Sequence, residues 1–211
     1  MMRCMRNTSK VKRKKRLKVK ASNVSQGFFV IGAGSFGTAL AIHLGNCGQA
    51  VSLWGNRPDE LKKMEVARTN DVYLPGYAFP DNLSIAHSLE DGMAAHNDIF
   101  IVVPSHAFRD VLRSIKPFLR KEHRLLWGAK GLDPDSGELL HTVVYEELGD
   151  IPMAALSGPS FAKELAEGLP TAVVIAGSHG EYTDELIKRF SGRQFRAYRN
   201  DDIVGVSLGG A

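Results

Sequence analysis

The feature that most constrains this chain is a glycine-rich turn within Val30–Gly37, which reads Val-Ile-Gly-Ala-Gly-Ser-Phe-Gly. The apolar run Phe28–Ile31 leads into the turn, and a helical pattern of small and apolar residues follows it. In a strand–turn–helix unit with the spacing G-x-G-x-x-G, the first glycine permits a tight turn, the second leaves room for a pyrophosphate and the third lets the helix pack closely. The helix start then offers N–H groups and a positive dipole end to phosphate. We therefore predict that Gly32, Gly34 and Gly37 form a dinucleotide-binding turn.

Beyond this turn, short apolar runs alternate with helical patterns up to residue 198. The clearest run is Asp98–Val103, which is apolar after its first residue, as in a strand buried on both faces of a parallel sheet. This alternation predicts right-handed crossovers and an α/β fold with a doubly wound, parallel sheet of the Rossmann type. The segment 70–80, with its Tyr-Leu-Pro-Gly run, reads as a loop.

The pattern divides the chain into three regions. We expect residues 1–26 to be a basic, disordered tail and residues 27–199 to be the dinucleotide-binding domain. Residues 200–211 differ, because two acidic residues suited to a helix start are followed by small and apolar residues up to Ala211. We read this last region as the first turns of a buried helix, and so as only the start of a truncated C-terminal helical domain.

The net charge of +4 comes from the N-terminal tail. Residues 1–26 hold ten basic residues and no acidic ones, and without them 17 basic residues face 23 acidic ones, a net charge of −6. The positive net charge of the whole chain therefore does not indicate a basic binding surface on residues 27–211. The tail lacks the apolar core of a secretory signal. A transit peptide, a nucleic-acid contact and an upstream-extended start codon stay open for it, and we expect no nucleic-acid partner elsewhere.

Residue spacing argues against several kinds of site. The two cysteines, Cys4 and Cys47, have no partner at metal-ligand spacing and give no disulfide framework, so we expect no metal and a reducing, cytoplasmic location. No apolar run approaches the roughly 20 residues of a membrane span. Ser105 lacks the nucleophile elbow of a hydrolase. His106 is a candidate proton donor, although a lone histidine after a strand is more often structural.

Further candidates follow the carboxyl ends of other expected strands, where open α/β sheets bind ligands. Asn56 and Arg57 stand where an NAD-specific site would hold Asp or Glu. A cation there suits a 2′-phosphate, so we expect NADP or NAD as cofactor; the alternative is that Arg57 only covers the adenine. Lys130, between two glycines, could reach a phosphate or carbonyl oxygen, or be a solvated loop lysine. Ser157–Ser160 precedes a helical pattern and could bind an anion, or Ser160 could only cap the helix.

Seven short motifs carry a resemblance to a known family. They read GAGSFGTALA, LWGNR, YLPG, VVPSH, AKGL, SGPSFAKE and IVGVSLGGA, and they lie at residues 32–41, 53–57, 73–76, 102–106, 129–132, 157–164 and 203–211. In order and spacing they resemble the bacterial NAD(P)-dependent sn-glycerol-3-phosphate dehydrogenases. The match runs from about residue 27 to the last residue, and seven motifs in register are far more specific than the glycine turn alone.

The resemblance implies cofactor-binding roles for five residues outside the three turn glycines and Lys130. Ser35 and Phe36 would contact the pyrophosphate of the cofactor. Asn56 and Arg57 would contact its adenosine end. Ala162 would line the cofactor site near the expected sixth strand.

The resemblance also implies a substrate site. Lys130 would touch both the cofactor and glycerol phosphate, and Gly158 and Ser160 would line the substrate site. The implied reaction is reversible hydride transfer between NAD(P)H and dihydroxyacetone phosphate, which gives sn-glycerol 3-phosphate for glycerophospholipid synthesis. The cofactor supplies that chemistry, and the protein supplies positioning and charge stabilisation.

The chain departs from the family at its end. In the family, a lysine soon after Gly-Gly-Ala is the proton donor or acceptor, and an all-helical domain supplies further substrate residues. This chain ends at Ala211, before that lysine, so we expect a fragment without a catalytic residue of its own and with little activity alone. The alternative is a non-catalytic NAD(P)-binding module. For the full-length enzyme, the resemblance leaves a homodimer open.

Overall fold

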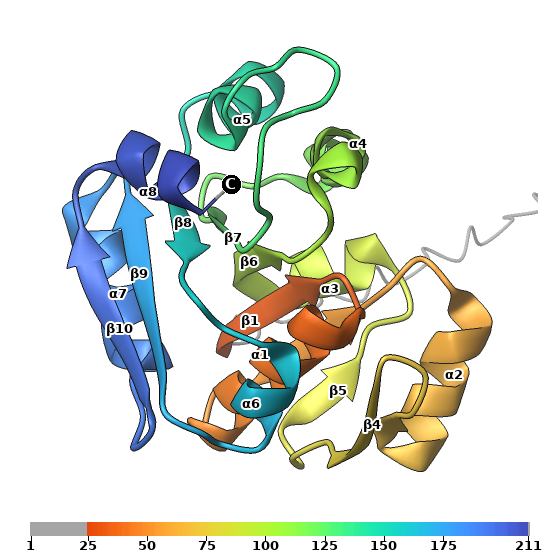
Figure 1. Ribbon diagram of the computed structural model, residues 1–211. Helices are drawn as coiled ribbons and strands as arrows, with labels where there is room; N and C mark the ends of the chain where they lie inside the picture. The colour runs from red at the N-terminus through yellow and green to blue at the C-terminus, as the bar shows by residue number, and fades with distance from the viewer. Residues whose placement is uncertain (1–24, 211) are drawn as a thin grey trace, which may run out of the picture.

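A computed structural model describes residues 25–210, so nearly all of the expected tail lies outside the described residues. Its centre is an eight-stranded sheet with the strand order β10-β9-β8-β7-β6-β1-β2-β5 (Figure 1). The strands are β1 (Ser25–Ile31), β2 (Val51–Trp54), β5 (Leu83–Ile85), β6 (His96–Ile101), β7 (Arg124–Trp127), β8 (Met153–Ser157), β9 (Thr171–Gly177) and β10 (Phe195–Asn200). The order reverses at β1, which lies between β2 and β6. The prediction of a doubly wound sheet is confirmed, and its ligand crevice is expected at this switch point.

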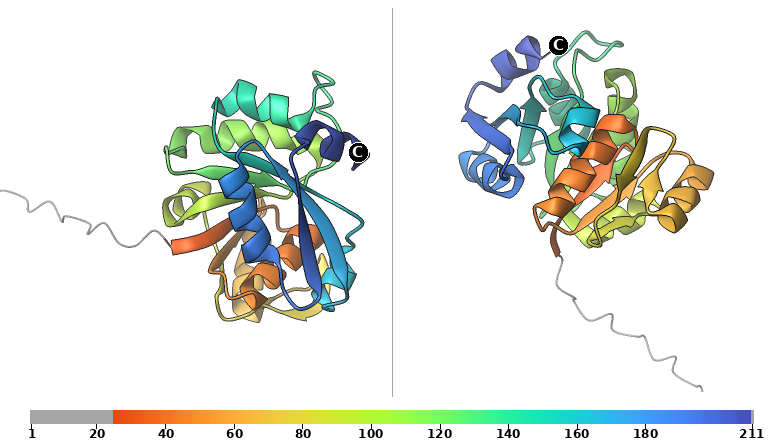
Figure 2. Two further views of the ribbon diagram at one scale, coloured as in Figure 1. Left: turned by 90° about the vertical axis from the view of Figure 1, so that its left-hand side faces the viewer. Right: turned by 60° about the horizontal axis from the view of Figure 1, so that its bottom comes forward.

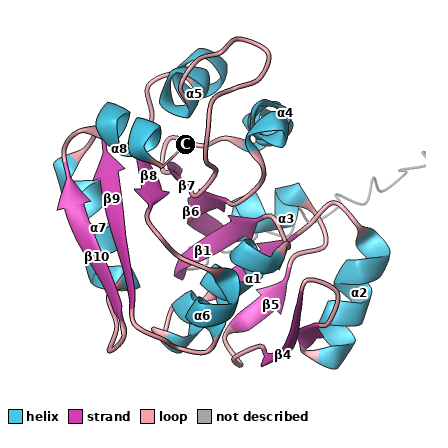
Figure 3. Ribbon diagram, viewed as in Figure 1, coloured by secondary structure: helices cyan, strands magenta, loops and turns pink. Residues whose placement is uncertain are grey.

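Helices cover both faces of the sheet (Figures 2 and 3). They are α1 (Ser35–Asn46), α2 (Pro58–Ala67), α3 (Leu89–Ala95), α4 (Ser105–Ile115), the 3-10 turn η1 (Lys116–Phe118), α5 (Leu140–Leu148), α6 (Ala162–Ala166), α7 (Gly180–Phe190) and α8 (Ile203–Gly209). The views place α4 and α5 on one side of the sheet and α1 and α6 on the other. None of the helices in the described part of the chain has the length and apolar character of a membrane span.

The core consists of two apolar layers, one on each face of the sheet. Along β1, Phe28 and Val30 pack with α1 and α7, whereas Phe29 and Ile31 pack with α3, α4 and α5. This alternation is the period of two that a strand imposes on its side chains. All four side chains are completely buried, so the strand is apolar throughout, as the sequence pattern predicted.

One pair of strands departs from the expected parallel sheet. β9 runs antiparallel to β8, with Ser157 opposite Val174, while all other neighbours in this sheet are parallel. A parallel connection needs a crossover of roughly a dozen residues or more, usually a helix that lies along the sheet. The link between β8 and β9 contains only the five-residue α6, which packs on α1, so the chain returns in the opposite direction.

The segment expected to be a loop, residues 70–80, contains strand structure. β3 (Thr69–Asn70) and β4 (Leu74–Ala78) form a small antiparallel hairpin outside the main sheet. The loop prediction was therefore wrong here, because the Tyr-Leu-Pro-Gly run suggested only a turn. The hairpin packs against α1 and α6, close to the glycine turn.

The last described helix, α8, begins where the sequence predicted a helix start. The Asp202 side chain caps it by accepting a hydrogen bond from the Gly205 N–H at 2.8 Å. In this chain Val204 is 42% exposed and Leu208 is 55% exposed, and the burial of this helix in a C-terminal domain stays a prediction. The helix nevertheless contacts β8 and β9. The division of the chain at residues 27 and 199 stays a prediction.

Candidate dinucleotide and substrate site

The glycine turn joins β1 to α1 at the carboxyl edge of the sheet. Gly32 has φ +122°, and a Cβ there would lie 2.1 Å from the Val102 carbonyl oxygen. A Cβ on Gly37 would lie 1.9 Å from the Gly32 carbonyl oxygen. At Gly34, in contrast, a Cβ would meet nothing within 4 Å. The first and third glycines are therefore required by the protein's own backbone, whereas the second faces open space of the kind a phosphate would fill.

The first turn of α1 has the properties of an anion site. Gly34 is its N-cap residue, and no side chain caps the helix. The leading N–H groups of a helix have no partner within the helix, and the dipole makes this end positive. Ser35 and Phe36 lie in this turn, as the resemblance implied. The Ser35 hydroxyl, however, donates to the Tyr73 carbonyl oxygen at 2.6 Å, so the side chain bonds to the hairpin. The group of Ser35 that can face a phosphate is its backbone N–H.

Asn56 and Arg57 follow β2, beside the glycine turn in the sheet. Arg57 is the N-cap residue of α2, and its guanidinium donates to Glu60 at 2.8 Å. This pairing raises the pKa of Arg57, which stays charged, and 62% of its side chain is exposed. A hollow of about 400 Å³ adjoins these residues; its lining includes Trp54, Asn56 and Leu61. The position offers a cation and an apolar wall to an adenosine group.

Lys130 and Gly158 lie together although they are far apart in the sequence. The Lys130 ammonium donates to the Gly158 carbonyl oxygen at 3.2 Å, across the ends of β7 and β8. Lys130 is exposed, so its remaining N–H donors can reach a ligand. Gly158 has φ +151°, and a Cβ there would lie 2.9 Å from the Ala172 carbonyl oxygen. The structure thus brings two of the sequence-predicted substrate residues into direct contact.

Ser160 and Ala162 continue the same segment. α6 begins at Ala162 with Phe161 as its N-cap residue and without a side-chain cap, so Ser160 is not the helix cap that the sequence left open. The Ser160 hydroxyl oxygen is buried and has no hydrogen-bond partner within the described residues. A buried hydroxyl without a partner is costly. The hydrogen-bonding capacity of this hydroxyl is therefore unused among the described residues.

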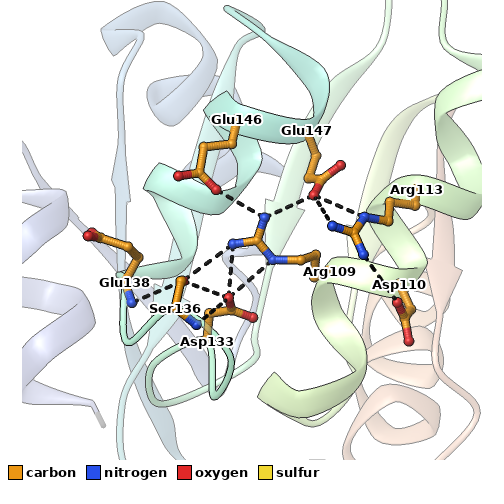
Figure 4. Close-up of polar contacts among 8 residues, drawn as sticks. All are labelled: Arg109, Asp110, Arg113, Asp133, Ser136, Glu138, Glu146 and Glu147. Atoms are coloured by element: carbon orange, nitrogen blue, oxygen red, sulfur yellow. Dashed lines mark hydrogen bonds and ion pairs between the residues drawn. The ribbon is translucent and has the colours of Figure 1, made fainter.

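An ion-pair cluster, which sequence reasoning missed, supports the loop that follows Lys130. Arg109 on α4 donates to Asp133 at 2.9 Å and also pairs with Glu146 and Glu147 on α5 (Figure 4). Asp133 also accepts from Ser136, and these bonds lower the pKa of Asp133, with the Arg109 bond contributing most. The cluster fixes the 131–139 loop between two helices. No sequence signal links Arg109 to this loop, because the partners are separated by 24 to 38 positions.

The remaining sequence candidates show no comparable geometry. His106 lies exposed in the first turn of α4. Within residues 25–210, no group of three or more His, Cys, Asp and Glu side chains is placed to hold a metal. Cys47 is partly buried beside His43, its Sγ 3.6 Å from Nε2, and burial raises the pKa of the thiol. Cys4 lies outside the described residues.

The fold and the glycine turn define a dinucleotide-binding domain of the doubly wound class, with its site at the carboxyl edge of the sheet. The model of the family "NAD-dependent glycerol-3-phosphate dehydrogenase N-terminus" matches residues 28–183, so this chain belongs to that family.

Similar proteins agree with this assignment. The chain is 48% identical over 192 residues to glycerol-3-phosphate dehydrogenase [NAD(P)+] of Serratia proteamaculans, covering 90% of this chain and 57% of the relative. It is 49% identical over 184 residues to the enzyme of that name from Shewanella frigidimarina, covering 86% and 54%. A crystal structure of glycerol-3-phosphate dehydrogenase from Coxiella burnetii matches with a TM-score of 0.85 and 44% identity, covering 89% and 57%. The chain thus spans about half the length of the curated relatives it matches.

Proposed function

We propose that this chain binds NADP or NAD and forms the cofactor-binding half of an sn-glycerol-3-phosphate dehydrogenase [NAD(P)+]. The observation that carries the proposal is the glycine turn, in which Gly32 and Gly37 are forced by backbone contacts while Gly34 faces open space. This is the arrangement that admits a pyrophosphate beside the start of α1. The family membership of the chain supports the same cofactor class.

Each end of the cofactor has a candidate binding residue. The N–H groups of Ser35 and Phe36 would hold the pyrophosphate at the uncapped start of α1. Asn56 and Arg57 would hold the adenosine end, where the guanidinium can bind a 2′-phosphate in a bidentate manner. Ala162, at the start of α6, would line the cofactor site. When bound, the nicotinamide supplies hydride transfer; the protein residues orient it.

The proposed substrate is dihydroxyacetone phosphate, with sn-glycerol 3-phosphate as the product for glycerophospholipid synthesis. The Lys130 ammonium would hold a phosphate or carbonyl oxygen as a compact positive charge. Ser160 would donate or accept through a hydroxyl that has no partner within the described residues. Gly158 would allow the close approach of ligand to backbone. The same proposal includes the enzyme activity named for the relatives. It also includes a cytoplasmic location and a homodimer of the full-length enzyme.

The cofactor proposal is tested by fluorescence titration of the chain with NADPH and NADH. We expect saturable binding of both, with NADPH preferred because Arg57 is cationic. Arg57→Asp should reverse or abolish this preference. Lys62→Asp is the matched control, because Lys62 is an exposed cation on the same helix and makes only a 3.8 Å pair with Asp59. An unchanged preference in Arg57→Asp would refute Arg57 as the 2′-phosphate contact.

The substrate proposal is tested by adding dihydroxyacetone phosphate to the NADPH-loaded chain and recording cofactor fluorescence. We expect a saturable change that Lys130→Met weakens about tenfold or more, through loss of a charge-assisted contact. Lys163→Met is the control, since Lys163 is exposed on the neighbouring α6. A response that is equal in wild type and Lys130→Met would contradict the role of Lys130.

A further inference from the structure

We infer that the β3–β4 hairpin is a clasp that holds the glycine turn in its phosphate-binding shape, and that Asn70 is the positioning residue at its centre. The inference rests on the proposed function, because the turn matters only if it binds a dinucleotide. It assigns a role to a segment that the sequence pattern presented as a plain loop. Asn70 itself touches no expected ligand and acts through the turn.

The Asn70 side chain joins three parts of the site. Its amide nitrogen donates to the Ala33 carbonyl oxygen at 3.0 Å and to the Thr38 hydroxyl at 2.8 Å. Its amide oxygen accepts from the Tyr73 N–H at 3.2 Å. The residue is 1% exposed, and Thr38 is completely buried. Both amide donors and the acceptor are thus used, in a site where an unpaired polar group would be costly.

The bond to Ala33 reaches the turn itself. Ala33 lies between Gly32 and Gly34, and its carbonyl group is part of the peptide unit that leads into Gly34, the N-cap residue of α1. The bond to Thr38 ties the same amide to the first full turn of that helix. Because glycine residues accept many backbone conformations, this segment needs an external restraint to stay in one of them. Asn70 provides that restraint with neutral hydrogen bonds, which place no additional charge near a phosphate.

Two outer contacts hold the hairpin in place. The Ser35 hydroxyl donates to the Tyr73 carbonyl oxygen at 2.6 Å, so the start of α1 and the hairpin are joined a second time. On the far side, the Tyr77 hydroxyl donates to Glu167 at 3.0 Å, which ties β4 to the end of α6. The clasp therefore spans from the glycine turn to the segment that carries Ala162. A preorganised turn binds its ligand without first losing conformational entropy, which is a gain in affinity.

The chain contains a natural control for Asn70. Asn82 also donates two amide hydrogen bonds, to the carbonyl oxygens of Gly45 at 2.9 Å and Gln49 at 2.7 Å, at the opposite end of α1. Replacing Asn82 removes the same type of contact from the same helix, but away from the glycine turn. The two asparagines therefore separate an effect on the helix from an effect on the turn.

The experiment measures binding of two probes to the wild-type chain and to the variants Asn70→Asp, Asn70→Ala, Ser35→Ala and Asn82→Ala. NADPH carries the pyrophosphate, whereas adenosine 2′-monophosphate carries only the adenosine end and the 2′-phosphate. Dissociation constants are measured by NADPH fluorescence and by competition, at a temperature where circular dichroism shows each variant to be folded. Asn70→Asp keeps the side-chain volume, and Ser35→Ala removes only an outer contact, so both remain testable if Asn70→Ala fails to fold.

We expect Asn70→Asp to raise the dissociation constant of NADPH about tenfold or more and to leave that of adenosine 2′-monophosphate within about twofold. Ser35→Ala should raise the NADPH constant by a smaller factor, and Asn82→Ala should change neither constant. If both probes weaken equally in Asn70→Asp, or if NADPH binds as in wild type, the positioning role is wrong. If the wild-type chain binds neither probe, the proposed function fails instead, so the two failures are distinguishable.

Discussion

The two ends of the central sheet are built by opposite means. At the carboxyl end, the glycine turn is held by neutral hydrogen bonds from Asn70 and leaves open space at Gly34. At the amino end, an ion cluster centred on the buried Asp98 joins β6, β7 and α7. Asp98 is 2% exposed and pairs with both Arg124 and Arg189, and Glu185 pairs with the same two arginines.

At the amino end of the sheet, aromatic rings pack against the charged groups. The guanidinium of Arg189 lies 4.0 Å from the ring centre of Phe28, and that of Arg124 lies 4.7 Å from the ring centre of Tyr182. Such stacking fills the space beside the charges with apolar surface. His96, also at this end, is buried and its Nε2 lies 2.8 Å from the Ser52 hydroxyl.

The two ends of the sheet differ in which residues stabilise the fold and which residues can bind a ligand. A buried carboxylate shared by two arginines makes the amino end intolerant of change, because removal of one partner leaves uncompensated charge. The carboxyl end instead keeps uncapped N–H groups and an unpartnered Ser160 hydroxyl within the described residues. We therefore expect substitutions at the amino end to alter folding without altering ligand affinity. At the carboxyl end we expect the reverse for a residue that faces open space, such as Gly34.

The largest expected effect is that of Asp98→Ala. Its loss removes the buried carboxylate that pairs with Arg124 and Arg189 and leaves Glu185 paired with both, which should lower the free energy of unfolding by about 3 kcal/mol. The dissociation constant of NADPH, measured on folded protein, should stay within about twofold of wild type. Urea unfolding combined with NADPH titration measures both quantities. Asp110→Ala is the control, because Asp110 is exposed and makes only a 3.9 Å pair; an equal loss in both variants would contradict the account.

A pH effect of intermediate size is expected from His96. Burial lowers the pKa of His96 to about 4, from an ordinary value of 6.5. In the unfolded chain His96 therefore takes up a proton near pH 6.5, whereas in the folded chain it takes up a proton only near pH 4. The stability from this group is fully present above pH 6.5 and falls as pH is lowered through this window, by about 2 kcal/mol at pH 5.

The measurement is the free energy of unfolding at pH 7, 6 and 5 for the wild type and for His96→Gln. The variant should show a flatter decrease between pH 6.5 and 5, because Gln does not titrate. Burial also lowers the pKa values of His43 and His123, so part of the decrease remains in the variant. Parallel curves for the two proteins would show that His96 does not contribute.

The smallest change in stability is expected for Gly34→Ala, which should nevertheless weaken binding. Gly37→Ala, in the same turn, is the comparison. Gly37→Ala should lower the free energy of unfolding by about 1–3 kcal/mol, because the added Cβ would lie 1.9 Å from the Gly32 carbonyl oxygen. Gly34→Ala has open space around its Cβ and φ −77°, so stability should change by only about 0.5 kcal/mol.

Gly34→Ala should nevertheless raise the dissociation constant of NADPH about tenfold or more, because the methyl group occupies the space for the pyrophosphate. Thermal unfolding and NADPH titration of the two variants decide the matter. If Gly34→Ala binds NADPH like the wild type, then the open space beside Gly34 is not the phosphate site.

Local sequence signals predicted most of the fold. The glycine turn, the apolar strands such as β6 and the helix start at Asp202 all depend on residues close in sequence, so their patterns are readable. The contact between Lys130 and Gly158 could be expected only in outline, because both follow strands that end at one edge of the sheet.

What the sequence did not reveal depends on distant partners. Asn70 meets Ala33 across 37 positions, and Arg109 meets Asp133 across 24. The antiparallel course of β9 follows from the shortness of α6 and its packing on α1, which a strand–helix alternation does not encode. The hydrogen bond from the Ser35 hydroxyl to Tyr73 was not predicted, because the hairpin that accepts it was itself read as a loop.

We expect a dinucleotide to bind at the carboxyl end of the sheet, while the amino end serves only the fold. The most direct measurement is a ¹H–¹⁵N correlation spectrum of the chain recorded with increasing NADPH. We predict saturable shifts of the amide signals of Gly34, Ser35 and Arg57, with those of His96 and Asp98 unchanged. Saturable shifts confined to the amino end, or none at Gly34 and Ser35 at saturation, would contradict the account.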